Sequence, residues 1–172
     1  MRKLVMYVVI LTFFSCDDGD LQIETIDFDS ISTINTCNTI EVAQENVSFK
    51  INGSEALILT LPANLLKNEA TTEDITSSIS ESGPVILTYR TFSETVSTEY
   101  FCASIPPTTP VVLEEIVAKN GTVFIRTTTE DQGSTFLHQI TLADTTFENS
   151  SKERITNLSI RSYGEITTRV EE

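Results

Sequence analysis

The sequence predicts an all-β protein, an antiparallel β-sandwich that is either single or two-lobed, with at most one or two short helices. Thr, Ile and Val supply 26, 18 and 12 of the 172 residues, against seven Ala. Branched β-carbons favour the pleated sheet over the helix. With 40% apolar residues the chain can bury a core, so a fully disordered chain is not expected.

Turn signals separate the expected strands. Asn-Gly pairs tolerate the positive φ angles of tight hairpins, and a Gly after Tyr gives a weaker signal of the same kind. We expect three hairpins, centred on Asn52-Gly53, Asn120-Gly121 and Tyr163-Gly164. They would join 46–51 to 54–61, 111–118 to 122–129, and 155–162 to 165–170.

Two segments are candidates for short helices. Pro62 suits a first helical position and is followed by residues through Lys67 that are compatible with a helix. A second candidate begins at Thr72, since Glu73 and Asp74 would lie in its first turn, where the helix dipole favours acids.

A proline-rich connector at 106–110 divides the expected strands. It would separate a β-rich lobe over 21–105 from a second lobe over 111–172. About 60 residues are close to the lower limit for independent stability. We therefore favour a shared sandwich, single or two-lobed, over two autonomous domains.

The first 15 residues predict a signal peptide. Arg2 and Lys3 precede an uncharged, apolar stretch from Leu4 to Phe14. This stretch is too short to span a bilayer, which takes about 20 residues, and it fits the apolar region of a secretory signal. Removing it would leave a more acidic mature chain.

The segment from Leu11 to Cys16 resembles a bacterial lipobox, with the small Ser15 directly before the cysteine. The resemblance implies cleavage before Cys16 and acylation of that residue. More than one acyl chain makes membrane anchoring stable. An ordinary cleaved signal peptide, with Cys16 incidental, is the alternative.

An acidic tether over 16–20 follows the lipobox. Asp17, Asp18 and Asp20 resemble the export signal of surface lipoproteins in the Bacteroidota. The mature region is similar to uncharacterised flavobacterial lipoproteins, in Tyr89–Phe92, Tyr100–Pro107 and His138–Leu142. The resemblance implies an exported, surface-exposed outer-membrane lipoprotein, and it brings no activity with it.

Cys37 and Cys102 remain once Cys16 is assigned to the lipid. An even pair in an exported protein favours a disulfide. The alternative is two buried free thiols that pack as small apolar side chains. The spacing between them is not that of a redox-active C-x-x-C pair.

Catalytic and metal-binding patterns are scarce. His138 is the single histidine, and its alternation with Phe136, Ile140 and Leu142 places it on an inward strand face. We expect a structural histidine, no catalytic residue, no metal and no cofactor. The acidic clusters are expected to be solvated surface, and Tyr163 is the tyrosine most expected to be exposed.

Two triplets match a bacterial O-glycosylation pattern, in which Asp precedes the modified hydroxyl. They place candidate modifications on Ser30 and Thr145, which follow Asp29 and Asp144. Such short patterns also arise by chance.

Charge and composition bound the function. Acidic residues outnumber basic ones 25 to 11, for a net charge of −14, so nucleic acid is not an expected partner. We expect a non-catalytic, lipid-anchored envelope protein that binds a glycan or an envelope protein, with the membrane contacted through its anchor. The alternatives are a carboxylate-based hydrolase acting on glycans and a purely structural surface coat protein.

Overall fold

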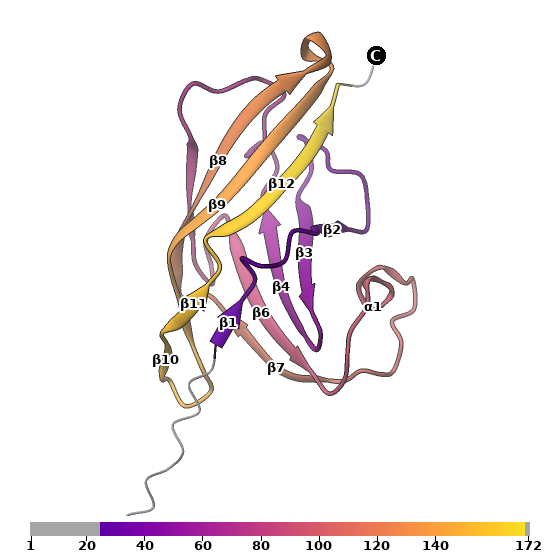
Figure 1. The fold of residues 1–172 in the computed structure, drawn as a ribbon, viewed down its shortest axis with the longest axis vertical. Coiled ribbons are helices and arrows are strands. Elements are labelled where there is room, and N and C mark those ends of the chain that lie inside the picture. The colour runs from indigo at the N-terminus through magenta and orange to yellow at the C-terminus, as the bar shows by residue number, and fades with distance from the viewer. Residues whose placement is uncertain (1–24, 171–172) are drawn as a thin grey trace, which may run out of the picture.

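A computed structural model describes residues 25–170. The chain forms two five-stranded sheets that face each other, together with a short parallel pair of strands (Figure 1). The strands within each five-stranded sheet are antiparallel. The predicted all-β sandwich is confirmed.

The first sheet has the strand order β2-β3-β4-β6-β7. Its strands are β2 (Asn35–Thr36), β3 (Asn46–Asn52), β4 (Glu55–Leu61), β6 (Ile86–Phe92) and β7 (Val112–Val117). The predicted hairpin at Asn52-Gly53 is confirmed: Asn52 pairs with Glu55, and Gly53 takes a φ of 61° in the two-residue loop.

The second sheet contains the longest strands. It comprises β5 (Ile75–Ile79), β8 (Asn120–Glu130), β9 (Thr135–Glu148), β10 (Arg154–Ile155) and β12 (Ser162–Arg169). A 3-10 turn, η1 (Asp131–Gly133), joins β8 to β9. The parallel pair is formed by β1 (Thr25–Asp27) and β11 (Asn157–Ser159).

The chain crosses between the sheets on both sides of the proline-rich connector. β5 lies in the expected first lobe but pairs with β8, whereas β7 lies in the expected second lobe but pairs with β6. The segments 21–105 and 111–172 therefore do not form separate lobes. Each sheet takes strands from both segments, and the result is a single sandwich.

Two of the expected hairpins are wrong. β7 pairs within the first sheet, so Asn120-Gly121 begins β8 after a crossover and lies at an irregularity in its pairing with β9. Tyr163 and Gly164 lie inside β12, again at a register shift. A Gly that tolerates an unusual φ serves a bulge as well as a turn, and the local sequence does not distinguish the two.

The two expected helices are also wrong. Residues 62–67 form turns, in which Asn64 has a positive φ of 65°, and the segment after Thr72 leads into β5. The α-helix of the described chain is α1 (Thr98–Cys102), on the loop between β6 and β7.

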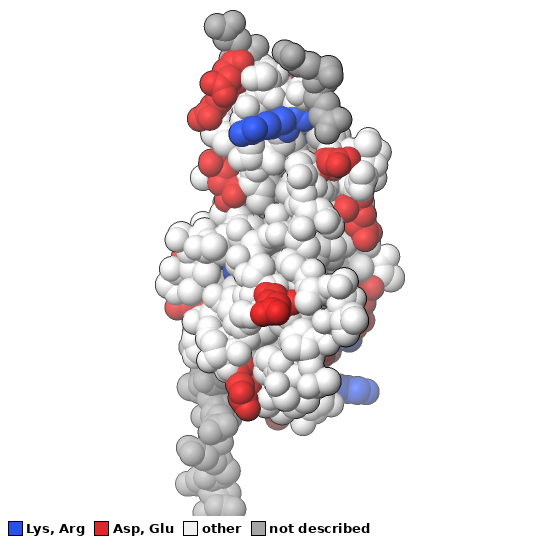
Figure 2. All heavy atoms as spheres, turned by 90° about the vertical axis from the view of Figure 1, so that its right-hand side faces the viewer, with Lys and Arg blue, Asp and Glu red and all other residues white. Residues whose placement is uncertain are grey.

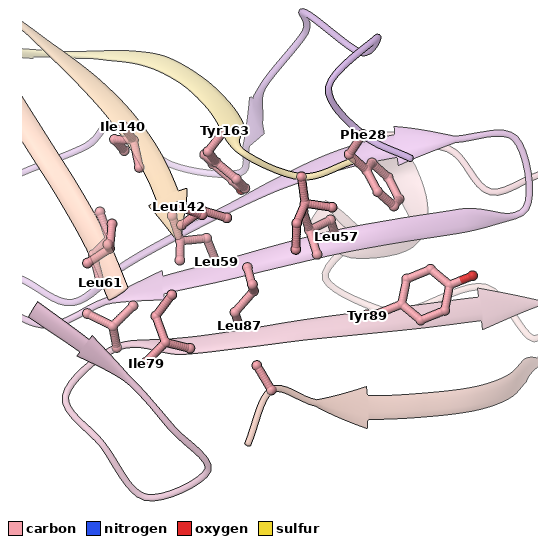
Figure 3. Packing of buried hydrophobic residues seen from close by; sticks show 14 of the residues in the cluster. Phe28, Leu57, Leu59, Leu61, Ile79, Leu87, Tyr89, Ile140, Leu142 and Tyr163 are labelled. Carbon is pink, nitrogen blue, oxygen red and sulfur yellow. The ribbon is translucent and has the colours of Figure 1, made fainter. Parts of the chain in front are cut away.

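The core lies between the inner faces of the two sheets. Leu57, Leu59 and Leu87 from the first sheet meet Ile140 and Leu142 from the second (Figure 3). The remaining large side chains of the cluster include Phe28, Leu61, Ile79, Tyr89, Val123, Ile125, Phe147 and Tyr163. One apolar cluster thus joins strands from both sides of the connector, and this explains why the halves do not separate.

Candidate functional site

The N-terminal features predicted from the sequence lie outside the described residues. These are the signal peptide over 1–15, Cys16, Asp17, Asp18 and Asp20. They stay predictions. Within residues 25–170, no helix has the length and apolar character needed to cross a membrane.

A disulfide joins Cys37, just after β2, to Cys102 at the end of α1. The sulfur atoms are 2.00 Å apart, and the bond closes a sequence separation of 65 residues. Both residues are exposed. In this structure the pair is a bridge and not two buried thiols.

A hollow of about 670 Å³, which we call the β3-edge hollow, lies beside the disulfide. β2 pairs only with Ser48 and Phe49 of β3. The hollow opens beside the part of β3 that precedes these two residues. Its lining comes from the loop between β2 and β3, from β3 itself and from α1: Cys37, Asn38, Thr39, Ile40, Glu41, Gln44, Glu45, Asn46, Val47, Phe49 and Phe101.

The wall of the β3-edge hollow is fixed by hydrogen bonds as well as by the disulfide. The buried Asn46 side chain donates to the carbonyl oxygens of Glu41 and Gln44, at 2.7 and 3.0 Å, and accepts from the Glu41 backbone N–H at 3.0 Å. A loop that is held by both a covalent bond and hydrogen bonds keeps its conformation before any ligand binds.

The lining combines an apolar floor with an acidic rim. The Phe49 and Phe101 rings stack with centroids 4.2 Å apart, and Val47 is 47% exposed. Glu41 and Glu45 are exposed beside them, and no Lys or Arg belongs to the lining. Acidic residues are more widespread than basic ones on the side of the molecule seen in Figure 2.

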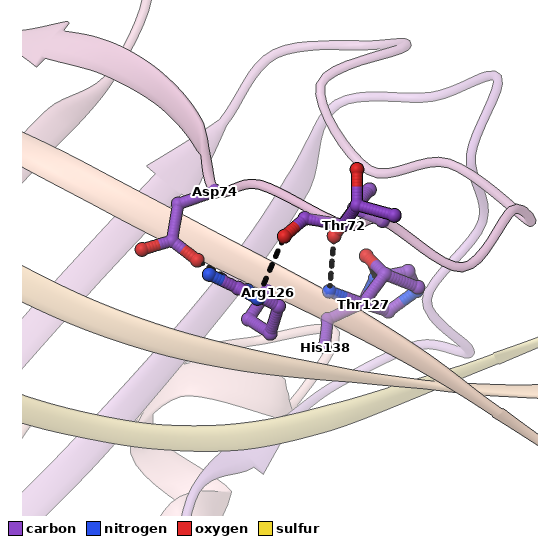
Figure 4. Close-up of polar contacts among 6 residues, drawn as sticks. Thr72, Asp74, Arg126, Thr127 and His138 are labelled. Carbon is purple, nitrogen blue, oxygen red and sulfur yellow. Dashed lines mark hydrogen bonds and ion pairs between the residues drawn. The ribbon is translucent and has the colours of Figure 1, made fainter.

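His138 is fully buried in a polar chain across β8, β9 and β12, and Figure 4 shows it beside Thr127 of β8. The Thr168 hydroxyl donates to Asn68 Oδ1 at 2.5 Å, so it must accept from His138 Nε2 at 2.7 Å. His138 Nδ1 then accepts from the Thr127 hydroxyl at 2.9 Å. Burial lowers the pKa of His138 to about 4.

The predicted structural role of His138 fits this geometry. Both ring nitrogens are engaged by threonine hydroxyls, and the ring has no exposed surface. A general base must reach the proton that it abstracts from a substrate. Within the described residues, no three His, Cys, Asp or Glu side chains are grouped so that they could hold a metal ion.

The expectation that Tyr163 is exposed is wrong, because Tyr163 belongs to a second cluster of buried polar side chains. Tyr163 is fully buried, its hydroxyl lies 3.0 Å from Ser48 Oγ, and burial raises its pKa. Lys50 lies over its ring and donates to the carbonyl oxygens of Phe28 and Ser162, at 2.8 and 3.0 Å. Desolvation lowers the pKa of Lys50, and nearby Asp29 and Asp27 oppose that shift. This group pins β12 and the N-terminal segment onto β3.

A second, shallower hollow of about 380 Å³ lies on the outer face of the second sheet. We call it the open-face hollow; its lining is Asp74, Phe124, Arg126, Gln139 and Thr141. Arg126 Nε donates to Asp74 Oδ1 at 2.5 Å, and Nη1 donates to the Thr72 carbonyl oxygen at 3.0 Å (Figure 4). No local motif predicts this group, because its members come from three separate strands or their ends.

The two candidate glycosylation sites differ in access. Ser30 is exposed. Thr145 is 8% exposed, its Oγ1 is buried, and an added side chain at Gly121 would meet that oxygen at 3.1 Å. A transferase cannot reach a hydroxyl packed in this way, so the prediction for Thr145 is wrong, whereas modification of Ser30 stays a prediction.

Comparison with known proteins places the chain in no family: no family model, no curated protein and no solved structure matches it.

Proposed function

We propose that this protein is a non-catalytic, lipid-anchored envelope protein that binds a partner protein through the β3-edge hollow. The observation that carries the proposal is the preformed, acidic and partly apolar lining of that hollow. Its floor offers Val47 and the Phe101 ring, which stacks on the buried Phe49, and its rim offers Glu41 and Glu45. Concave sites that are formed before the ligand arrives and that combine apolar and polar groups are typical of binding sites.

Charge complementarity defines the partner. The rim carries carboxylates and amides and no basic side chain, within a chain of net charge −14. A segment with a Lys or Arg flanked by apolar residues would place its charge at the rim and its apolar side chains on Val47 and Phe101. Complementary potentials also speed association and reject acidic partners.

The arrangement of the sandwich is compatible with an N-terminal anchor. β1, the first described strand, lies towards one end of the molecule, whereas the β8–β9 turn lies at the other (Figure 1). An anchor at Cys16 would then direct the β8–β9 end away from the membrane. The proposal of outer-membrane anchoring itself rests on the lipobox and the acidic tether.

A hydrolase that acted in the β3-edge hollow would have to use Glu41 and Glu45, the two acids of its lining. Both are exposed, and the Glu41 carboxylate accepts from Gln44 Nε2 at 2.6 Å. A carboxylic acid that donates a proton near neutral pH needs an apolar, desolvated position, which neither residue has. At the β3-edge hollow, the exposure of both acids favours binding over catalysis.

The anchor is tested by Cys16→Ala in the full chain. We expect the variant to lose incorporation of labelled fatty acid and to leave the membrane fraction, because the acylated residue is gone. Protease treatment of intact cells should cleave the wild-type protein. Unchanged labelling of the variant, or resistance to protease until the cells are lysed, would contradict the anchor and the surface position respectively.

Binding is tested with a photo-crosslinking residue, benzoylphenylalanine, placed at Val47 in intact cells. Val170 serves as the matched control position, because it is 49% exposed against 47% for Val47. We expect one discrete protein adduct at position 47 that is lost when Glu41→Gln and Glu45→Gln are combined, and no such adduct at position 170. An absent adduct, or one that is insensitive to the two glutamates, would overturn the proposal.

A further inference from the structure

The outer face of the second sheet carries two adjacent rows of side chains that run across the strands. In one row, Thr76 of β5 lies opposite Phe124 of β8, which lies opposite Thr141 of β9. In the next, Arg126 lies opposite Gln139, and Gln139 lies opposite Glu165 of β12. Neighbouring strands are about 4.8 Å apart, so members of a row are close enough to contact one ligand.

Several polar groups of these rows have unused hydrogen-bonding capacity. Arg126 engages Nε and Nη1 internally, and no bond within residues 25–170 occupies its Nη2. Asp74 accepts through Oδ1, which leaves Oδ2 to solvent. In the same part of the chain, the side chains of Gln139 and Thr141 make no hydrogen bond. The face therefore presents donors, acceptors and groups that act as both.

Phe124 gives this polar face one aromatic surface. It is half-buried, it points to the face opposite the core residues Val123 and Ile125, and it lines the open-face hollow together with Arg126 and Gln139. A sugar ring presents an apolar C–H face and a rim of hydroxyls that both donate and accept. An aromatic side chain beside unpartnered polar groups matches both features.

We infer that the open-face hollow, with the two rows that cross it, binds a neutral carbohydrate. The charge of the hollow selects for neutrality, because the Arg126 guanidinium is offset by the Asp74 carboxylate that it contacts. A phosphate or carboxylate ligand would meet Asp74 and Glu165, and a cationic ligand would meet Arg126. The inference is independent of the partner-binding proposal, since the two hollows lie on different sheets.

The test is native gel electrophoresis of the full-length protein in detergent, with soluble neutral polysaccharides cast into the gel: mannan, galactomannan, arabinoxylan, mixed-linkage glucan and dextran. We expect at least one of them to retard the protein. Phe124→Ala should weaken that binding about tenfold, which is the scale of one aromatic contact. Arg126→Ala should weaken it to a similar extent.

Arg90→Ala is the matched control, because Arg90 also forms an ion pair, with Glu115, on the outer face of the first sheet. It should leave the retardation unchanged. Phe124→Leu keeps the side chain apolar while removing the ring, so it tests the stacking contact even if Phe124→Ala fails to fold. No retardation in any gel, equal effects of Phe124→Leu and Arg90→Ala on retardation, or competition by inorganic phosphate would each overturn the inference.

Discussion

The outer faces of the two sheets differ in polarity and in how far they are covered. On the first sheet an apolar group of outward residues, Phe49, Ile51, Ala56, Ile58 and Phe92, lies beside the Arg90–Glu115 pair, and the loop between β6 and β7 covers part of this group with Tyr100 and Phe101 of α1. On the second sheet the outward residues are mainly Thr, Ser, Gln and Arg, and they face solvent. An apolar outer face needs a cover, whereas a polar one stays available for a ligand.

The cover of the first sheet creates the β3-edge hollow. The disulfide fastens the loop after β2 to the end of α1, and Phe101 stacks on Phe49 at the same place. The β3-edge hollow thus lies where the loop that carries α1 meets the edge of β3. The open-face hollow, by contrast, belongs to the regular sheet itself.

The disulfide provides the largest expected effect. Replacing both partners, Cys37→Ser with Cys102→Ser, frees a loop with a sequence separation of 65 residues and should lower the free energy of unfolding by about 4 kcal/mol. Urea denaturation measures the change. Amide exchange should rise around α1 and the loop before β3 while β8 and β9 stay protected; a loss below about 1 kcal/mol would show that the cover holds without the bond.

Two phenylalanines compare the covered face with the open one. Phe92 is 3% exposed and packs edge-to-face on Tyr100 at 5.0 Å, so Phe92→Ala should cost about 3–4 kcal/mol. Phe124 is half-buried on the open face, and Phe124→Ala should cost about 1 kcal/mol. Thermal and urea unfolding of both variants check the difference, and equal costs would contradict the distinction between the faces.

His138 makes the inner side of the second sheet sensitive to pH. Its pKa falls from 6.5 to about 4 on folding, so between these values the unfolded chain binds more protons and stability decreases as the pH falls. The loss should reach at most about 3 kcal/mol near pH 4. The His138→Gln variant should lack this pH-dependent loss of stability. The carboxylates are common to the wild-type protein and the variant, so their contribution cancels when the two are compared.

The titration can also be observed directly. His138 is the single histidine of the chain, so its ring C–H signal in proton NMR is unambiguous. We expect a midpoint near 4. A midpoint close to the ordinary 6.5 would show that the ring is hydrated and that the Thr127–His138–Thr168 chain is not closed.

The two arginine pairs should give the smallest effects. Arg126 and Arg90 are both partly exposed, each beside one carboxylate. Exposed ion pairs contribute up to about 1 kcal/mol, so Arg126→Ala and Arg90→Ala should each change stability by less than that. Urea denaturation checks this, and a larger loss for Arg126 alone would give it a structural role beyond its proposed contact with ligand.

The local sequence pattern predicted the burial of one side chain and the position of one hairpin. The alternation from Phe136 to Leu142 places His138 inward, and the structure buries it with Ile140 and Leu142. The Asn52-Gly53 hairpin followed from the φ freedom of its glycine. These features depend on neighbouring residues, which the sequence displays directly.

Strand partners could not be predicted in the same way. Asn120-Gly121 carries the same turn signal as Asn52-Gly53, yet β7 pairs with β6 and β8 pairs with β5 and β9. The burial of Tyr163 follows from its place in β12, over Lys50 and Ser48. Neither partner of Tyr163 is near it in sequence.

Composition and two-residue periodicity predict the fold class, the inward position of His138 and the acidic balance of the chain, because each of these depends only on local residue types and spacing. Long-range packing sets the exchange of strands across the 106–110 connector, the bridge between Cys37 and Cys102 and the burial of Thr145. It also sets the grouping of Asp74, Phe124, Arg126 and Gln139 on one open face. Each of these features depends on which distant segments pair by hydrogen bonds or pack in the same core. Such pairing buries apolar area of the whole chain, and no local segment shows it.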